Sequence, residues 1–178
     1  MHTSELFSLK GQCAVVVGGA GKIGFPMVEA LAEAGAKVYI ASRRRENYLI
    51  SVKKLQKKGL DVEGIALDQS DEANVLEVLD QISNDFKAPD ILINSGYSRP
   101  MKNYFDDTVD NWDKSMTINA RGMFITCRAF GNVMAQQGKG TIINISSIYG
   151  IVGSKGGTSY HSAKGGVRTF TKATAIQY

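Results

Sequence analysis

Residues 141–164, TIINISSIYGIVGSKGGTSYHSAK, contain the strand, loop and helix start from which the fold of this chain can be predicted. Residues 141–145 are rich in β-branched side chains, which favour a buried strand. A polar, glycine-rich loop follows, and Thr158 or Ser159 could cap the helix that begins there. A strand that leads through a short loop into a helix is a unit of α/β sheets.

The same stretch places three chemically useful side chains near one another. Tyr160 and Lys164 are four residues apart, so on a helix they share one face. A nearby lysine cation favours the phenolate form of a tyrosine, which could then exchange a proton with a carbonyl or an alcohol. Ser147, at the strand end, could hydrogen-bond the same oxygen. On spacing alone, an ordinary pair on a helix surface is the alternative.

Strand and helix patterns alternate along the rest of the chain. Short apolar runs predict four further strands at residues 13–17, 37–41, 62–67 and 90–94, and helical periodicity predicts helices from the glycine-rich segment to Ala34 and at residues 46–58, 71–86 and 109–137. This alternation indicates an α/β fold, a doubly wound parallel sheet, in one domain over residues 1–178.

Each predicted helix has an apolar stripe that should face the sheet. The inward positions are Ile23, Met27 and Leu31; Leu49, Val52 and Leu55; Val75, Leu79 and Ile82; and Trp112, Met116, Asn119, Met123, Cys127, Phe130 and Met134. Asn119 is the polar misfit, because an unpaired buried amide costs ~1–3 kcal/mol. Either it bonds a neighbouring backbone group, or it holds a kink or an ordered water near the site.

Composition excludes several classes of function. The 178 residues are 43% hydrophobic with a net charge of +4, and they contain no apolar run of the ~18 residues that a membrane span needs. Residues 1–10 lack the apolar core of a signal peptide, so a cytoplasmic location is expected. Cys13 and Cys127 are expected to be reduced core residues, and no Cys/His cluster suggests a metal. Basic runs at 43–45 and 53–58 do not require a nucleic acid.

A glycine-rich segment indicates a dinucleotide site. Ligands of parallel sheets bind at the carboxyl ends of the strands. The loop Gly18-Gly19-Ala20-Gly21-Lys22-Ile23-Gly24 follows the first predicted strand there and precedes a helix. It fits the pattern G-x-G-x-x-G, in which glycines let a pyrophosphate approach the backbone at the helix N-terminus.

The end of the second predicted strand favours NADP(H) over NAD(H). An acidic residue at this place usually bonds the ribose of NAD, but Ser42 and Arg43 stand here instead. Arg43, with Arg44 or Lys22, could pair with a 2′-phosphate, although NAD(H) stays possible. Alternatively, residues 43–45 simply begin a solvated helix.

Together these residues resemble the short-chain dehydrogenase/reductase family in its classical form. The resemblance rests on the glycine loop, Asp68, Asn94-Ser95-Gly96-Tyr97, Asn119, residues 143–147 (INISS) and residues 160–164 (YHSAK). It implies a Rossmann fold and an NAD(P)-dependent oxidoreductase that interconverts a secondary alcohol and a ketone. The resemblance also implies a role for each of six residues. Tyr160 would be the acid/base, Lys164 would bind the nicotinamide ribose, and Ser147 would orient the substrate. Asn119 would support a water-linked proton relay, Asp68 would contact the adenine, and Asn94 would stabilise the central strand.

The sequence departs from the family at several places. Val17 stands where a threonine is usual, Lys22 replaces a glycine of the loop, and Ser95-Gly96-Tyr97 replaces Asn-Ala-Gly. Family members continue past the position of Tyr178, so the resemblance implies that the C-terminal strands are missing and that turnover is weak or absent. A nucleotide-sugar epimerase or dehydratase and a non-catalytic dinucleotide-binding fragment are the alternatives.

The resemblance also implies the partners. A small alcohol or ketone is the expected substrate, and Arg99, Tyr149 and Ser154 are candidates for its remaining wall. The complete protein is expected to form a homodimer or homotetramer through its two long helices, residues 109–137 and 158–178. Neither a nucleic acid nor a membrane is an expected partner.

Overall fold

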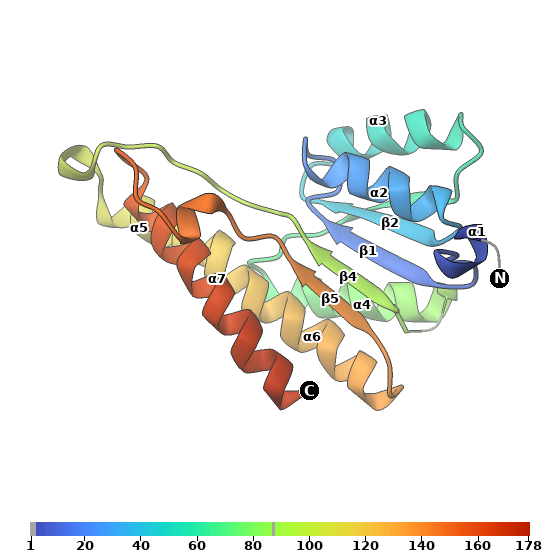
Figure 1. Ribbon diagram of the computed structural model, residues 1–178. Coiled ribbons are helices and arrows are strands. Elements are labelled where there is room, and N and C mark those ends of the chain that lie inside the picture. The colour runs from blue at the N-terminus through green and yellow to red at the C-terminus, as the bar shows by residue number, and fades with distance from the viewer. Residues whose placement is uncertain (1–2, 87) are drawn as a thin grey trace.

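Five parallel strands form the sheet at the centre of the molecule, in the order β3-β2-β1-β4-β5 (Figure 1). The computed structural model describes residues 3–86 and 88–178; Met1 and His2, the start of the segment 1–10, lie outside them. The strands are β1 (Cys13–Val17), β2 (Lys37–Ser42), β3 (Val62–Ala66), β4 (Ile91–Asn94) and β5 (Thr141–Asn144). Their ends agree with the predicted ends to within one residue.

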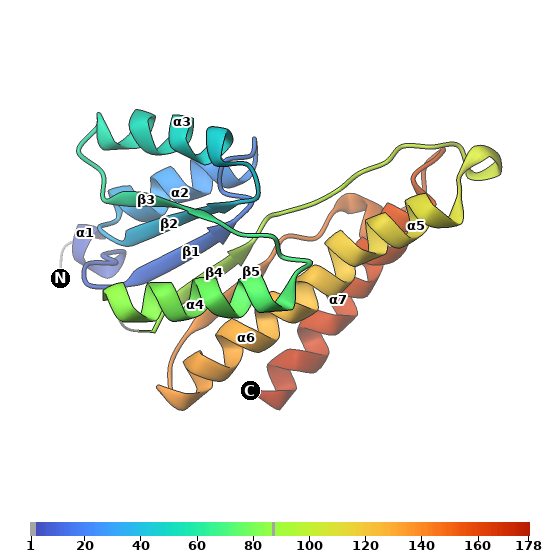
Figure 2. The same ribbon diagram turned by 180° about the vertical axis from the view of Figure 1, so that it is seen from behind.

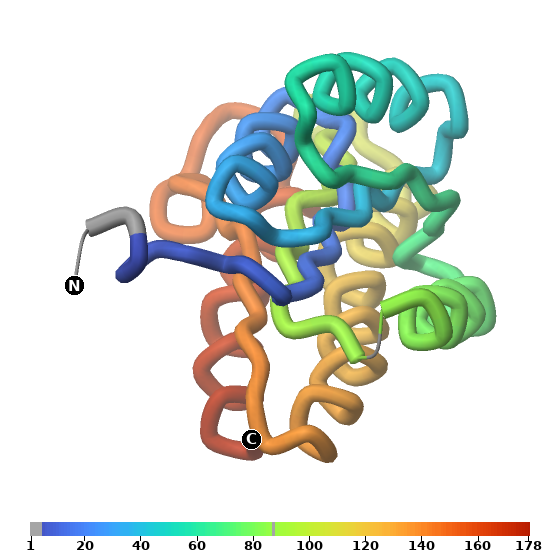
Figure 3. The backbone as a smooth tube through the Cα atoms, turned by 90° about the vertical axis from the view of Figure 1, so that its right-hand side faces the viewer, coloured from blue at the N-terminus to red at the C-terminus, as the bar shows by residue number. Residues whose placement is uncertain are grey.

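Helices cover both faces of this sheet, which confirms the doubly wound arrangement (Figures 2 and 3). The helical elements, in chain order, are α1 (Thr3–Leu6), α2 (Gly24–Glu33), α3 (Arg45–Gln56), α4 (Glu72–Phe86), η1 (Tyr104–Asp106), α5 (Val109–Met116), η2 (Thr117–Arg121), α6 (Gly122–Gln136), η3 (Ile148–Gly150) and α7 (Thr158–Gln177). Ala14 and Val16 of β1 pack with α2 and α3, while Val15 and Val17 pack with α4 and α6. All five residues of β1 are buried, which explains its continuous apolar sequence.

Two predicted apolar stripes are shifted in the structure. The buried residues of α2 are Gly24, Val28 and Ala32, one position after the predicted stripe, and Ile23 is exposed. Small residues on this face let the helix lie close to the sheet, and Met27 and Leu31 pack at its flank. In α3, Tyr48 is buried in place of Leu49, which is exposed. The stripe of α4 is as predicted: Val75, Leu79 and Ile82 are buried.

The predicted helix over residues 109–137 is present as an unbroken helical segment over residues 109–136, but it contains a π turn that the sequence analysis did not predict. A π-helical turn, η2, separates α5 from α6, and Asn119 lies within it. A π turn inserts extra backbone and so changes the direction of the side chains before it. This shift accounts for Trp112, which was predicted to face inward but is exposed, whereas Met123, Phe130 and Met134 are buried as expected.

The start of α7 also differs from the prediction. Neither Thr158 nor Ser159 caps it; the N-cap is Gly157, whose φ of 73° lies in the left-handed region that favours glycine. The Ser159 side chain is instead fully buried without a hydrogen-bond partner among the described residues. Within the described ranges, no helix is both long and apolar enough to cross a membrane.

Replacing Phe130 by alanine tests the core beneath the site. This side chain is fully buried between α4, α6 and the sheet, so we expect the substitution to lower the free energy of unfolding by ~3–5 kcal/mol. Urea unfolding followed by circular dichroism measures the loss. Phe105→Ala is the control, because Phe105 is 89% exposed and its loss should cost less than ~0.5 kcal/mol. Equal effects of the two substitutions would contradict the assigned core.

Candidate functional site

A cavity of about 270 Å³ lies at the carboxyl edge of the sheet, beside the glycine loop. Its walls come from the ends of β1, β2, β3 and β4 and from η2. The residues that line it are Val17, Gly18, Ala20, Gly21, Ile23, Gly24, Ser42, Arg43, Arg44, Asn47, Leu67, Asp68, Gln69, Ser95, Gly96, Tyr97 and Ile118. Of the residues predicted to bind cofactor, Gly19, Lys22, Asn94, Tyr160 and Lys164 do not line this cavity.

The glycine loop is shaped by close backbone contacts. Gly18 has a φ of 75°, and a Cβ atom there would lie 2.7 Å from the Cα atom of Gly96. A Cβ atom on Gly24 would collide with the carbonyl oxygen of Gly18. No side chain caps the N-terminus of α2. The amide of Phe25 donates to the carbonyl oxygen of Gly21 and Pro26 has no N–H, so the amides of Ile23 and Gly24 are the ones that can face an anion at the cavity. The loop therefore fits the pyrophosphate of a dinucleotide.

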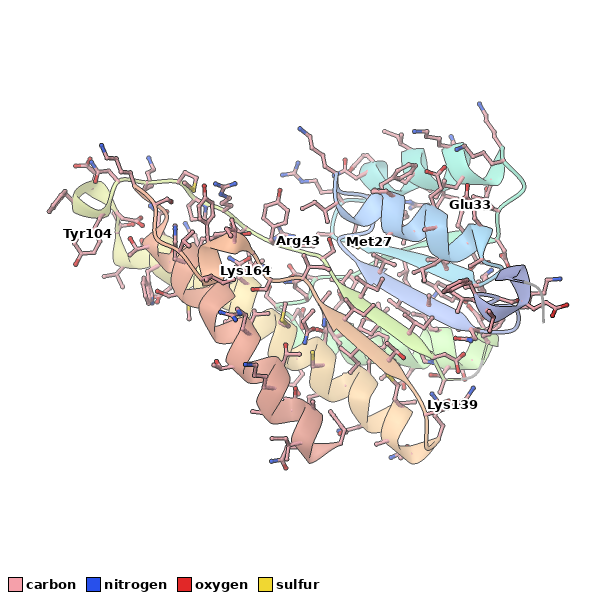
Figure 4. The ribbon with its side chains drawn as sticks, viewed as in Figure 1. Met27, Glu33, Arg43, Tyr104, Lys139 and Lys164 are labelled. Carbon is pink, nitrogen blue, oxygen red and sulfur yellow. The ribbon has the colours of Figure 1, made fainter. Side chains whose placement is uncertain are left out.

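The end of β2 brings positive charge to the same cavity. The guanidinium of Arg43 lies 3.9 Å from Asp68 Oδ2, and both side chains are substantially exposed. Asp68 Oδ1 accepts hydrogen bonds from the backbone amide and the hydroxyl of Ser70. Figure 4 shows Arg43 on the β2 side of this edge and Lys164 on the α7 side. The Arg43–Asp68 contact is weak and solvated, so Arg43 is free to turn toward a phosphate.

Sequence reasoning missed Gln69, which connects three parts of the site. This buried side chain donates through Nε2 to the carbonyl oxygen of Ile118, at 2.6 Å, and to that of Gly96, at 3.4 Å. It thereby ties the end of β3 to the loop after β4 and to the π turn. Its place directly after the predicted strand end was the one available signal, because no motif includes it.

Asn94, at the end of β4, connects this strand to its neighbours through its side chain. Its side chain donates to Asn144 Oδ1 of β5, at 2.9 Å, and accepts from the hydroxyl of Thr126 on α6, at 2.9 Å. It also donates to the thiol of Cys127. These contacts connect β4, β5 and α6 beneath the cavity. Both cysteines are free and buried, as predicted.

Tyr160 and Lys164 are buried rather than displayed on a helix surface. They are 7% and 2% exposed, and the ammonium lies 5.8 Å from the centre of the tyrosine ring. Lys164 Nζ donates to the carbonyl oxygen of Ile145, at 2.6 Å, just past β5. Burial lowers the pKa of Lys164 from 10.5 to about 8. A buried lysine with a lowered pKa next to a tyrosine makes these two residues candidates for a functional site.

The loop after β5 packs directly on α7 around these residues. Ser146 donates its hydroxyl to the carbonyl oxygen of Lys164, at 2.9 Å. Ser147 begins η3, and its Oγ accepts from the amide of Tyr149, at 3.2 Å. The hydroxyl proton of Ser147 is therefore available to another acceptor. The ring of Tyr149 lies edge-on to that of Tyr160, with centroids 6.4 Å apart.

Asn119 fixes the loop that follows β4. Its fully buried side chain accepts from the amide of Ser98, at 3.0 Å, and donates to the carbonyl oxygen of Ser98, at 2.6 Å. It also donates to the hydroxyl of Ser115. Of the two alternatives for Asn119, the structure shows parts of both. Asn119 bonds the backbone of Ser98, and it lies in a π turn that distorts the helix.

Tyr97 joins the cavity to the Tyr160 side of the site. It lines the cavity, and its ring packs edge-on against the ring of Tyr160 with centroids 6.4 Å apart. Tyr97 was known from the sequence only as a departure from a motif. The structure thus brings the glycine loop, Ser42, Arg43 and Asp68 to one cavity and places Tyr160 and Lys164 next to it.

The sequence of this chain is similar to those of known dehydrogenases. A family model described as short chain dehydrogenase matches residues 12–178. Cyclopentanol dehydrogenase of Comamonas sp. (strain NCIMB 9872) is 34% identical over 162 residues, which cover 91% of this chain and 65% of that protein. The chain therefore spans about 65% of the length of this curated relative. Gluconate 5-dehydrogenase of Gluconobacter oxydans (strain 621H) is 29% identical, and 100% of this chain and 70% of that protein are covered.

Solved structures share the fold. A gluconate 5-dehydrogenase from Burkholderia cenocepacia J2315, in complex with NADP and tartrate, matches with a TM-score of 0.93 and 28% identity, covering 99% of this chain and 69% of that one. An NAD+-bound xylitol dehydrogenase matches with a TM-score of 0.90 and 27% identity, covering 94% of this chain and 65% of that one.

The titration of Lys164 gives a test of its burial. Because its pKa is lower in the folded chain, between pH 8 and pH 10.5 the unfolded chain binds a proton that the folded chain lacks. The free energy of unfolding should therefore rise with pH across this window, relative to Lys164→Met, by about 3 kcal/mol. Urea unfolding at several pH values measures this difference.

Lys172→Met is the matched control, since Lys172 is exposed on the same helix. Its unfolding free energy should follow that of the unsubstituted chain across the window. If the difference in unfolding free energy between the unsubstituted chain and Lys164→Met did not change with pH, the lowered pKa of the buried Lys164 would be contradicted.

Proposed function

Since this chain belongs to the short-chain dehydrogenase family, we propose that it is an NAD(P)-dependent oxidoreductase that interconverts a secondary alcohol and a ketone. The observation that carries the proposal is the pairing of a buried Tyr160 with a buried Lys164 beside a glycine-lined cavity. Its relatives include proteins named cyclopentanol dehydrogenase, gluconate 5-dehydrogenase and xylitol dehydrogenase. These names support alcohol oxidation as the reaction class.

The residues around the cavity fit a nicotinamide dinucleotide. Amides at the start of α2 would hold the pyrophosphate, and Asp68 would lie at the adenine. Lys164 would donate to the ribose of the nicotinamide. When bound, the cofactor supplies or accepts the hydride. This chain's own residues then have to orient the substrate and move one proton.

Tyr160 holds that proton at its hydroxyl. In the reducing direction the phenol donates the proton to the carbonyl oxygen as negative charge develops there, and in the oxidising direction the phenolate accepts it from the alcohol. The Lys164 cation favours the phenolate that remains. Ser147 donates its free hydroxyl proton as a hydrogen bond to the same substrate oxygen, because its Oγ already accepts from Tyr149.

Asn119 has a positioning role in this proposal. Its amide is bonded to the Ser98 backbone on both sides, so it fixes the loop at the substrate end of the site. A water-linked relay through Asn119 stays a prediction, as does assembly through the helices α6 and α7. We also propose NADP(H) as the preferred cofactor, supported by Arg43 and Arg44 in the cavity wall and by the absence of an acidic residue at Ser42.

Tyr160→Phe tests the proton transfer. The variant keeps the ring and loses the hydroxyl, so in the complete protein we expect turnover of an alcohol substrate to fall by at least ~10²-fold. The affinity for NADPH, measured by calorimetry, should not change. Tyr104→Phe is the control: Tyr104 is 66% exposed at the tip of the molecule, far from Lys164 (Figure 4). Normal turnover by Tyr160→Phe would refute the assignment.

Arg43→Gln tests the cofactor preference. Loss of a charged partner for the 2′-phosphate should weaken NADPH binding by roughly tenfold and leave NADH binding unchanged. Titration calorimetry with each cofactor measures both values. Arg128→Gln is the control, because Arg128 pairs with Glu72 on the outer surface. Equal losses for NADPH and NADH would contradict a role at the 2′-phosphate.

A further inference from the structure

Arg99 lies beside Tyr160 and is not one of the residues that line the glycine-lined cavity. It belongs to the segment between β4 and α5, which runs next to the loop after β5 (Figures 1 and 2). Its guanidinium carbon is 4.8 Å from the ring centre of Tyr149 and 5.7 Å from that of Tyr160. Arg99 does not line the cavity assigned to the dinucleotide. Its charge therefore lies beside Tyr160 and outside the cavity assigned to the dinucleotide.

The backbone on both sides of Arg99 is held in position. Ser98, directly before it, is bonded through both its amide and its carbonyl to Asn119. Three residues after it, the carbonyl oxygen of Lys102 accepts from the amide of Gly157, at 2.9 Å, next to the start of α7. Arg99 Nε also lies 3.2 Å from the sulfur of Met101. The guanidinium is thus positioned by elements that also hold Tyr160.

No carboxylate in the described part of the chain forms an ion pair with Arg99. Residues 95–103 and 141–164, the two segments that carry Arg99, Tyr149 and Tyr160, contain no Asp or Glu. Residues 114–178 as a whole contain eight Lys and Arg and no acidic residue. An exposed, positioned and unpaired guanidinium is a binding site for an anion.

The geometry fits a carboxylate in particular. The guanidinium carbon lies over the rings of Tyr149 and Tyr160, and Nε donates to the sulfur of Met101. The two terminal N–H groups, on Nη1 and Nη2, have no partner among the described residues and are free to donate. This edge of the guanidinium matches the two oxygens of a carboxylate, which it can bind with two parallel hydrogen bonds. A group bound there lies within one small molecule's length of the Tyr160 hydroxyl. The alcohol carbon and the carboxylate can therefore belong to the same substrate.

We propose that Arg99 binds the carboxylate of the substrate, and that the substrates of this site are small hydroxy acids and the matching keto acids. This inference rests on the proposed function, because it assumes that Tyr160 marks the reacting carbon. It adds a substrate class that the family fold does not decide. Arg99 is a substrate-binding residue and takes no part in the proton transfer.

Binding of matched acid and alcohol pairs tests the proposal. D-gluconate is compared with D-sorbitol and L-lactate with propane-1,2-diol, because each pair differs in having a carboxylate or a hydroxymethyl group. Each compound is titrated calorimetrically into the full chain with and without NADPH. With NADPH no alcohol is oxidised, so affinity is measured without turnover. At least one acid should bind at least tenfold more tightly than its neutral partner.

Variants of Arg99 identify the group responsible. Arg99→Gln should lose at least about tenfold in affinity for the acid, and Arg99→Lys should recover only part of it because it lacks the planar fork. Neither should change binding of NADPH or of the neutral alcohols. Arg128→Gln is the control, since Arg128 also lies over an aromatic ring, Phe124, but on the outer face of α6.

Each outcome decides the question. Equal affinity for acid and neutral partner, no binding of either acid, or undiminished acid binding by Arg99→Gln overturns the proposal. Failure of NADPH to bind counts against the proposed function instead, and the titration without cofactor then still reports on Arg99. If acid binding disappears in Arg99→Gln while NADPH binding persists, the result supports both the role of Arg99 and the proposed function.

Discussion

The burial of the Lys164 ammonium is the constraint on which the arrangement of β5, the loop after it and α7 depends. Placing this cation among apolar groups is unfavourable, as its pKa of about 8 indicates. The structure compensates only in part, with one short hydrogen bond to Ile145 at the end of β5. The hydroxyl of Ser146, in the loop between β5 and α7, donates in turn to the carbonyl oxygen of Lys164. Strand, loop and helix must therefore all be in place before the cation can be held beside Tyr160.

A second constraint fixes the other side of the same site. The long helical segment contains a π turn, and the turn directs Asn119 at the backbone of Ser98. Gln69 reaches the same turn from the end of β3, through the carbonyl oxygen of Ile118. A regular helix would leave no free carbonyl there and would turn Asn119 elsewhere. Irregular backbone at this point thus joins the cavity beside the glycine loop to the segment that carries Ser98 and Arg99.

Charge separates the two halves of the site. The glycine loop and the N-terminus of α2 offer backbone amides to an anion, whereas the segment after β4 offers Arg99. Arg43 is partly balanced by Asp68, but Arg99 has no acidic partner in the described residues. An anionic cofactor and an anionic substrate could then bind at separate places without competing for one cation.

The sequence by itself determined the strands, their parallel arrangement and the glycine loop, Ser42, Arg43 and Asp68 at the cavity, because these depend on local patterns. Short β-branched runs form strands, and the polar side chains that follow them must meet at one edge of a parallel sheet. Tertiary structure alone decided which face of α2 and α3 is buried, since that depends on how closely each helix approaches the sheet. It also decided the π turn at Asn119, the bridge made by Gln69 and the place of Arg99 over Tyr149 and Tyr160. These contacts join residues distant in the chain, and no local spacing encodes such distances.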